Sequence, residues 1–164
     1  LPKVELQKAC AAGSGGNEMT QRVLYKKLRP EAVCPTYQSA DAAGADLCAA
    51  LPAPVTVQPG ETAFVPTGLS LEIPQGFVGL VCARSGLACK KGLAPANKVG
   101  VIDADFRGEL MVALFNHAQQ AVQVLPGERV AQLLLVPYLT AEFSESTVLS
   151  ETARGAGGFG STGK

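Results

Sequence analysis

Short apolar runs, cut by turn residues, make up most of the chain from Arg22 onward. Turns are indicated by the proline–glycine pairs at 59–60 and 126–127 and by residues 74–76, because both residue types interrupt regular structure. Runs of this length, with turn signals about every 8–12 residues, are typical of a β-sandwich or barrel. We therefore predict an all-β fold with strands in residues 55–57, 62–73, 77–83, 110–115, 121–125 and 130–138.

Several of these runs, notably 77–83 and 110–115, are apolar at consecutive positions rather than at alternating ones. A strand of this kind is buried on both faces. A small domain has little material with which to cover a second face, and a subunit interface is one way to supply the cover.

One segment, residues 85–92, predicts a short helix instead of a strand. Ser85 is a plausible N-cap, Lys90 and Lys91 suit the last turn, and Gly92 fits the position after it.

The two ends of the chain differ from the middle. We interpret residues 1–21 as a flexible leader and residues 22–145 as one β domain. Residues 146–164 end in a run too rich in glycine to fold alone, so we expect a mobile arm that becomes ordered on a ligand or a neighbouring chain.

Composition narrows the function classes. Glycine (18) and proline (11) are abundant, which disfavours a helical domain because both residues break helices. The net charge is zero, so nothing in the bulk charge suggests binding to nucleic acid or to a membrane. No apolar run reaches membrane-spanning length.

The five cysteines contain no C-x-x-C pair, and His117 is the single histidine, so a zinc site is not expected. The odd cysteine count and the lack of a secretory signal predict reduced thiols and an intracellular location. The cytoplasm is favoured, with the nucleus and the organelles left open.

Arg84, Ser85 and Gly86, at the predicted helix start, form a first candidate site. Exposed backbone N–H groups, the Arg84 guanidinium and the Ser85 hydroxyl can bind an oxyanion, and Gly86 lets it approach the backbone closely. The alternative is an ordinary capped helix with a surface arginine.

Residues 100–109 form a second candidate site, between two apolar runs, as a hairpin would. Asp103 and Asp105 are two positions apart and would point to one face of a strand. One carboxylate can act as a general base on water, and the other can pair with Arg107. The alternative is two turn aspartates at a hairpin tip.

Further candidates lie along the chain. For Asp46 the alternative is a turn or cap, and for Arg129 and Gln132 it is a solvent-facing strand position. In the tail, glycine N–H groups, hydroxyls and Arg154 can bind phosphate, and Phe159 can stack on a base. The whole set fits a nucleoside polyphosphate. With one histidine, a Ser–His or Cys–His nucleophile is not expected.

The chain resembles the trimeric dUTPase family, whose members carry five motifs in a set order. Matches to all five occur in order over roughly residues 22–163, at 43–47, 83–88, 100–109, 127–132 and 154–163. The resemblance implies a distorted jelly-roll (β-clip) barrel and a homotrimer whose C-terminal arm reaches over a site formed largely by neighbours. It also implies Mg²⁺-dependent hydrolysis of dUTP to dUMP and pyrophosphate by water attack at the α-phosphorus, which keeps uracil out of DNA.

The resemblance also implies residue roles. Asp103 would activate the attacking water, and Phe106, where the family usually has tyrosine, would pack on the deoxyribose. Asp46 would act through a metal-bound water, with Arg129 and Asp105 supporting the site. Contacts to uracil are expected from Asn97, Gly100, Val101, Ile102, Met111 and Phe159. Contacts to the phosphates are expected from Arg84, Ser85, Gly86, Gln132, Arg154, Gly160, Ser161 and Thr162.

The implied Mg²⁺ would be held mainly by the triphosphate and waters, since the chain lacks a dedicated carboxylate cage. Two rivals stay open. A dCTP deaminase shares the fold but uses a glutamate as base with different second and third motifs. A non-catalytic dUTPase-like regulator would usually have lost the base or the tail arginine, and both Asp103 and Arg154 are present.

Overall fold

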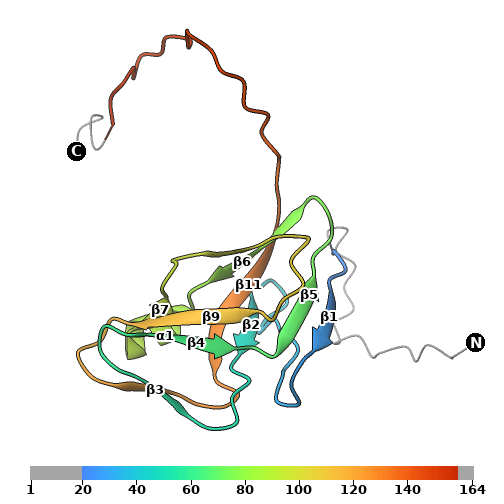
Figure 1. Ribbon diagram of the computed structural model, residues 1–164, viewed down its shortest axis with the longest axis vertical. Coiled ribbons are helices and arrows are strands. Elements are labelled where there is room, and N and C mark those ends of the chain that lie inside the picture. Colours follow the sequence, from blue (N-terminus) through green and yellow to red (C-terminus); the bar gives the residue numbers. More distant parts are fainter. Residues whose placement is uncertain (1–19, 159–164) are drawn as a thin grey trace, which may run out of the picture.

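The computed structural model describes residues 20–158, which form eleven short strands and one helix (Figure 1). The strands are Leu24–Lys27 (β1), Ala45–Cys48 (β2), Val55–Val57 (β3), Thr62–Pro66 (β4), Leu69–Glu72 (β5), Phe77–Cys82 (β6), Leu93–Pro95 (β7), Gly100–Ile102 (β8), Met111–Asn116 (β9), Val122–Val124 (β10) and Arg129–Pro137 (β11). The helix is Ser85–Lys91 (α1). The all-β prediction is confirmed.

Two antiparallel sheets enclose the core. One has the strand order β2-β11-β6-β8, and the other has the order β4-β9-β7. Their inward side chains, such as Leu47 and Val81 from the first and Val112 and Leu114 from the second, belong to one buried apolar cluster. Two strand pairs, β1-β5 and β10-β3, complete the fold. Many neighbours are distant in sequence, and β2 and β11 are an example.

The predicted strand at residues 62–73 is wrong in its extent, because two strands of different sheets occupy it. β4 pairs with β9, whereas β5 pairs with β1. The break falls at Gly68, whose φ of 68° is a left-handed conformation that favours glycine. Short β1, β2 and β7, of three or four residues each, were not predicted at all, since so few positions carry little periodicity.

The predicted helix is confirmed, with one correction at its start. Gly92 ends α1 in a left-handed conformation (φ 70°) and donates its N–H to Ala88 O at 3.1 Å. Lys90 and Lys91 lie in the last turn, as expected. The N-cap, however, is Arg84 and not Ser85, and no side chain caps the first turn. Ser85 is therefore the first helical residue, and its hydroxyl is not used as a cap.

Residues 100–109 do not form the predicted hairpin. β8 pairs with β6 in the four-stranded sheet, and β9 pairs with β4 and β7 in the other sheet. Residues 103–110 therefore cross from one sheet to the other. Asp103 and Asp105 do not share a strand face, because Asp103 follows β8 and Asp105 lies in a turn.

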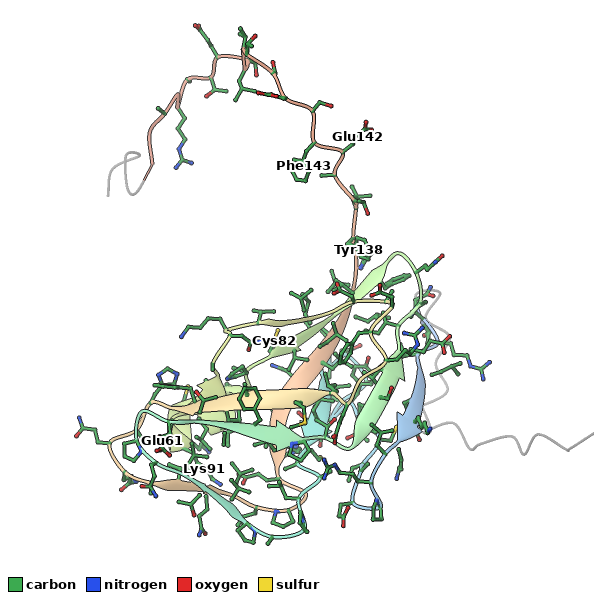
Figure 2. All side chains as sticks on the ribbon, in the orientation of Figure 1. Glu61, Cys82, Lys91, Tyr138, Glu142 and Phe143 are labelled. Atoms are coloured by element: carbon green, nitrogen blue, oxygen red, sulfur yellow. The ribbon has the colours of Figure 1, made fainter. Side chains whose placement is uncertain are left out.

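The last strand ends at Pro137, and residues 138–158 contain no helix or strand. Figures 1 and 2 show this segment leaving the body beyond Tyr138, with Phe143 far from both sheets. The side chains of Leu139 and Phe143 are 98% and 94% exposed. Within residues 20–158 no helix is long and apolar enough to span a bilayer.

The expectation of reduced thiols is wrong at Cys34, which is disulfide-bonded. An odd cysteine count cannot exclude a pair, which is why the sequence argument fails there. Cys48, Cys82 and Cys89 are free, as expected, and Cys10 lies outside the described residues.

Candidate active site

A pocket of about 220 Å³ collects predicted site residues from three separate segments. They meet because β11 lies between β2 and β6, and because α1 follows β6 directly. The lining residues are Gln38, Ala42, Gly44, Asp46, Arg84, Ser85, Gly86 and Gln132.

Asp46 is the charged centre of this pocket. Its side chain is buried, and Oδ1 accepts a hydrogen bond from Arg84 Nε at 2.7 Å. Its Oδ2 accepts one from Arg129 Nη1 at 3.0 Å, and Arg84 Nη1 donates to Arg129 O at 3.2 Å. A buried carboxylate is tolerated when it is paired and hydrogen-bonded in this way. Two guanidinium groups against one carboxylate leave the cluster with a net positive charge, which suits an anionic ligand.

The pairing of β11 with β2 places Gln132 next to Asp46. It is opposite Asp46 on β2 and opposite Cys82 on β6, and its Nε2 donates to Ala83 O at 2.9 Å. Gly44 leaves the space that this side chain needs, since a Cβ built on Gly44 would lie 2.4 Å from Gln132 Oε1. Gln132 is thus held against the backbone that leads into α1.

Gly44→Ala should therefore displace Gln132 and break its bond to Ala83. We expect a loss of about 1 kcal/mol in the free energy of unfolding, the usual value of one hydrogen bond. Urea unfolding of the two proteins measures it. Gly86→Ala is the matched control, because a Cβ there meets nothing within 4 Å. Equal stability of the Gly44→Ala protein and the parent would contradict the packing described.

Burial, and then the nearby Asp46 carboxylate, raise the pKa of the Cys48 thiol, while Arg129 and Arg84 oppose the shift. A raised pKa keeps this thiol protonated at neutral pH, so it is a poor nucleophile. Of the described residues that line the pocket, Asp46 is the only acidic one. Among residues 20–158, no group of three or more His, Cys, Asp or Glu side chains is placed to hold a metal ion.

Several other predicted residues, called the second group below, do not line this pocket: Asn97, Gly100, Val101, Ile102, Asp103, Phe106 and Met111. Asp103 is exposed directly after β8, and Met111 begins β9. The Phe106 ring lies over Gly108, where an added Cβ would come within 2.6 Å of Phe106 Cζ. Asn97 lies close to Gly100, since a Cβ built on that glycine would be 3.5 Å from Asn97 Nδ2. The structure therefore splits the predicted site into two parts of one chain.

The predicted ion pair between Asp105 and Arg107 is wrong. Arg107 Nη1 donates instead to Ala104 O at 2.6 Å and to Phe106 O at 2.9 Å. The Arg107 guanidinium therefore closes the turn after Asp103 instead of pairing with Asp105.

The tail residues are placed only in part. Arg154 is exposed, and its Nε donates to Gly157 O at 2.8 Å. It does not line the pocket around Asp46. Phe159, Gly160, Ser161 and Thr162 lie outside the described residues.

Sequence reasoning missed the two pocket residues Gln38 and Ala42. An isolated antiparallel bridge between Thr36 and Asp46 brings the segment that contains Gln38 and Ala42 to the pocket. Gln38 Nε2 also donates to Thr36 Oγ1 at 3.2 Å. No spacing rule points to such a bridge.

A larger open groove of about 840 Å³ lies between the C-terminal end of α1 and β10. Lys90, Lys91 and Gln123 are among its lining residues, and none of the residues predicted to do chemistry lines it. The smaller pocket is therefore the better candidate for an active site.

The chain is similar to known proteins of one family. The family model described as dUTPase matches residues 30–163. A deoxyuridine 5'-triphosphate nucleotidohydrolase of Desulfitobacterium hafniense is 45% identical over 148 residues, which are 90% of this chain and 98% of that protein. One of Rhizobium etli is 51% identical over 131 residues, 79% of this chain and 84% of that protein.

Solved structures of phage proteins have the same fold. The dUTPase of Staphylococcus bacteriophage 80alpha with dUPNHPP superimposes with a TM-score of 0.81 and 29% identity, covering 88% of this chain and 100% of that one. A mutant dUTPase from phage phi11 of S. aureus, described as coordinating a structural Mg(II) ion, has a TM-score of 0.73 and 25% identity. It covers 80% of this chain and 100% of that chain.

Proposed function

The chain belongs to the dUTPase family and hydrolyses dUTP to dUMP and pyrophosphate, and we propose that the pocket around Asp46 holds the triphosphate during this reaction. The observation that carries the proposal is the buried Asp46 carboxylate, which holds Arg84 and Arg129 beside Gln132. Ser85 and Gly86 line the same pocket, and Gly86 leaves open space for an oxygen to approach the backbone. Arg84, Ser85, Gly86 and Gln132 would bind phosphate, and Arg129 would brace the site.

The active site is completed by a second chain of a homotrimer. The group that contains Asp103, Phe106 and Met111 does not line the phosphate pocket of its own chain, so it would serve the pocket of a neighbour. An incompletely buried apolar face supports this arrangement. Leu134 is opposite Leu80, and Leu80 is opposite Val101, so the three point to one side of the sheet, where Val101 is 62% exposed.

This apolar face is continuous with the pocket, because Gln132 lies two positions before Leu134 on β11 and points to the same side. A neighbouring chain that covers Leu134 would therefore also stand over Gln132. The consecutive apolar residues of β6, in the run at 77–83, would then be covered on both faces of the sheet.

In the proposed mechanism, Asp103 orients a water and accepts its proton as the water attacks the α-phosphorus in line with the departing pyrophosphate. Asp103 is exposed on its own chain and follows the short strand β8, where its carboxylate can reach a ligand outside the chain. Charge that develops on the phosphates is neutralised by Arg84 and by backbone N–H groups, the larger contribution in phosphoryl transfer.

The uracil ring and the deoxyribose of the substrate would be bound by the second group of residues. Asn97 and the backbone of Gly100, Val101 and Ile102, with Met111, would bind uracil. The narrow space would exclude the methyl group of thymine. Phe106 presents an aromatic face to the deoxyribose and lacks the usual tyrosine hydroxyl, so sugar discrimination would be kept.

We propose that the reaction requires Mg²⁺, which neutralises triphosphate charge when it is bound. Asp46 fits an indirect contact, because each of its oxygens accepts one hydrogen bond from an arginine and has a lone pair left for a metal-bound water. The triphosphate itself would supply the direct ligands. Asp105 would support the site without contacting the substrate.

The arm, residues 146–164, would close the site. Deleting residues 154–164 should leave a folded trimer whose kcat for dUTP falls by about 10²-fold, since Arg154, Ser161 and Thr162 no longer bind the γ-phosphate and Phe159 no longer covers uracil. Size-exclusion chromatography with light scattering checks the trimer, and steady-state pyrophosphate release checks kcat. A fully active truncated protein would contradict the closing role of the arm.

The assignment of substrate is tested by pyrophosphate release from dUTP, dCTP, dTTP and UTP side by side. We expect turnover of dUTP alone, and ammonia release from dCTP would identify a deaminase instead. We also propose an intracellular, cytoplasmic location and domain limits at residues 1–21, 22–145 and 146–164.

A further inference from the structure

Residues 103–109 carry Asp103 and Phe106 between the two sheets with no strand pairing of their own. The position of such a segment depends on side-chain contacts rather than on a ladder of backbone bonds. Within it, Phe106 N donates to Asp103 O at 3.2 Å, and Arg107 Nη1 binds the carbonyls of Ala104 and Phe106. These bonds shape the turn but do not attach it to the body.

Attachment comes from the neighbourhood of β5. Ser70 Oγ donates to Arg107 O at 2.7 Å, and Gly68 N donates to Glu109 Oε1 at 3.0 Å. Arg29 binds both oxygens of the Glu109 carboxylate: Arg29 Nε donates to Oε1 at 2.7 Å, and Arg29 Nη2 donates to Oε2 at 3.0 Å. This fork-to-carboxylate geometry is the most directional that an ion pair has.

Glu109 differs from the other charged side chains of the segment. Among residues 20–158 the described ion pairs include Glu109 but not Asp103, Asp105 or Arg107. The hydrogen bond from Arg29 is the main cause that lowers the pKa of Glu109, with the Arg29 charge and the Gly68 N–H adding to it and burial opposing. Because the pKa of Glu109 is lowered, the ion pair is intact at any pH above the ordinary glutamate pKa of about 4.3. It is lost only as the pH falls through the pKa of Glu109 in the folded protein.

We propose that Glu109, clamped by Arg29, is a positioning residue for hydrolysis, because it sets where the segment that carries Asp103 and Phe106 stands. The inference rests on the proposed function of Asp103. The side chains of Arg29 and Glu109 are 42% and 21% exposed, and an ion pair that solvent reaches in this way contributes only about 1 kcal/mol to the free energy of unfolding. Misplacing a catalytic group by about 1 Å, in contrast, can cost up to 10²-fold in rate. The effect on turnover therefore exceeds the effect on stability.

The test compares Glu109→Gln, Arg29→Gln and the double variant in the full chain. Each should lower kcat for dUTP about tenfold, with KM changed less than kcat and Tm within a few degrees of the parent. The double variant should lose no more than Glu109→Gln alone, since both changes break the same contact. Hydrogen exchange, followed by mass spectrometry, should become faster in residues 103–109. Lys91→Gln breaks the similar exposed pair with Glu128 far from this segment and is the matched control.

A kcat within twofold of the parent for Glu109→Gln would overturn the inference, as would additive losses in the double variant or unchanged exchange in residues 103–109. An equal loss in Lys91→Gln would do the same. If Glu109→Gln fails to fold, Arg29→Gln, which keeps the bond from Gly68, decides alone by the same criteria. A parent protein that leaves dUTP intact would instead contradict the proposed function, and faster exchange in the variants would still show the clamp.

Discussion

Replacing Asp103 with asparagine should lower kcat for dUTP by about 10²–10⁴-fold, the usual contribution of a positioned general base. Asparagine keeps the size of the side chain but cannot accept the proton of the attacking water. Binding of dUTP should survive, because Arg84 and Gln132 lie in the other part of the site. Steady-state pyrophosphate release measures kcat, and calorimetry with Mg²⁺ and the slow variant measures the Kd of dUTP.

Asp105→Asn is the matched control for this experiment. Asp105 lies two residues away, is exposed, and forms no ion pair among the described residues. Its loss should lower kcat far less than Asp103→Asn does, because Asp105 supports the site without contacting the substrate and accepts no proton from the attacking water. If Asp103→Asn and Asp105→Asn reduced turnover equally, Asp103 would not be the base.

The sequence was sufficient for the elements that carry long apolar runs or clear caps. β9, β10 and β11 lie within one or two residues of the predicted runs, and Gly92 ends α1 as expected. These features are local: a strand needs its own apolar residues, and a helix end needs a residue that tolerates a left-handed conformation. The site residues that the resemblance implies were likewise assigned from local motifs, and Asp46, Arg84 and Gln132 among them line one pocket.

What the sequence could not show is which segments meet. Arg29 and Glu109 are 80 positions apart, and nothing in either segment indicates the other. The run at 62–73 keeps its apolar character across Gly68 although the chain changes sheets there. The same limit explains the false hairpin at 100–109, where two adjacent strands belong to opposite sheets. Partner choice depends on the whole fold and not on the local pattern.

Two inactive variants, Asp103→Asn and Arg84→Gln, should restore activity to each other when they are mixed in one trimer. Arg84 belongs to the pocket around Asp46, and Asp103 does not line that pocket. Suppose that each site takes its phosphate pocket from one chain and its general base from the next. About a quarter of all sites in an equal random mixture are then intact. The first chain must carry the unaltered arginine and its neighbour the unaltered aspartate, each with a chance of about one half.

The experiment refolds the two proteins together from urea and compares kcat with that of each protein refolded alone. Its control mixes the parent with a chain that carries both substitutions. A site shared between chains then keeps about a quarter of the parent activity per chain, whereas a site within one chain keeps about half. A mixture of the single variants that stays inactive, together with a control at one half, would place Asp103 and Arg84 of one chain in the same site. If the base reaches the phosphates from a neighbouring chain, as proposed, the opposite pair of results is expected, with recovered activity in the mixture and about a quarter of the parent activity in the control.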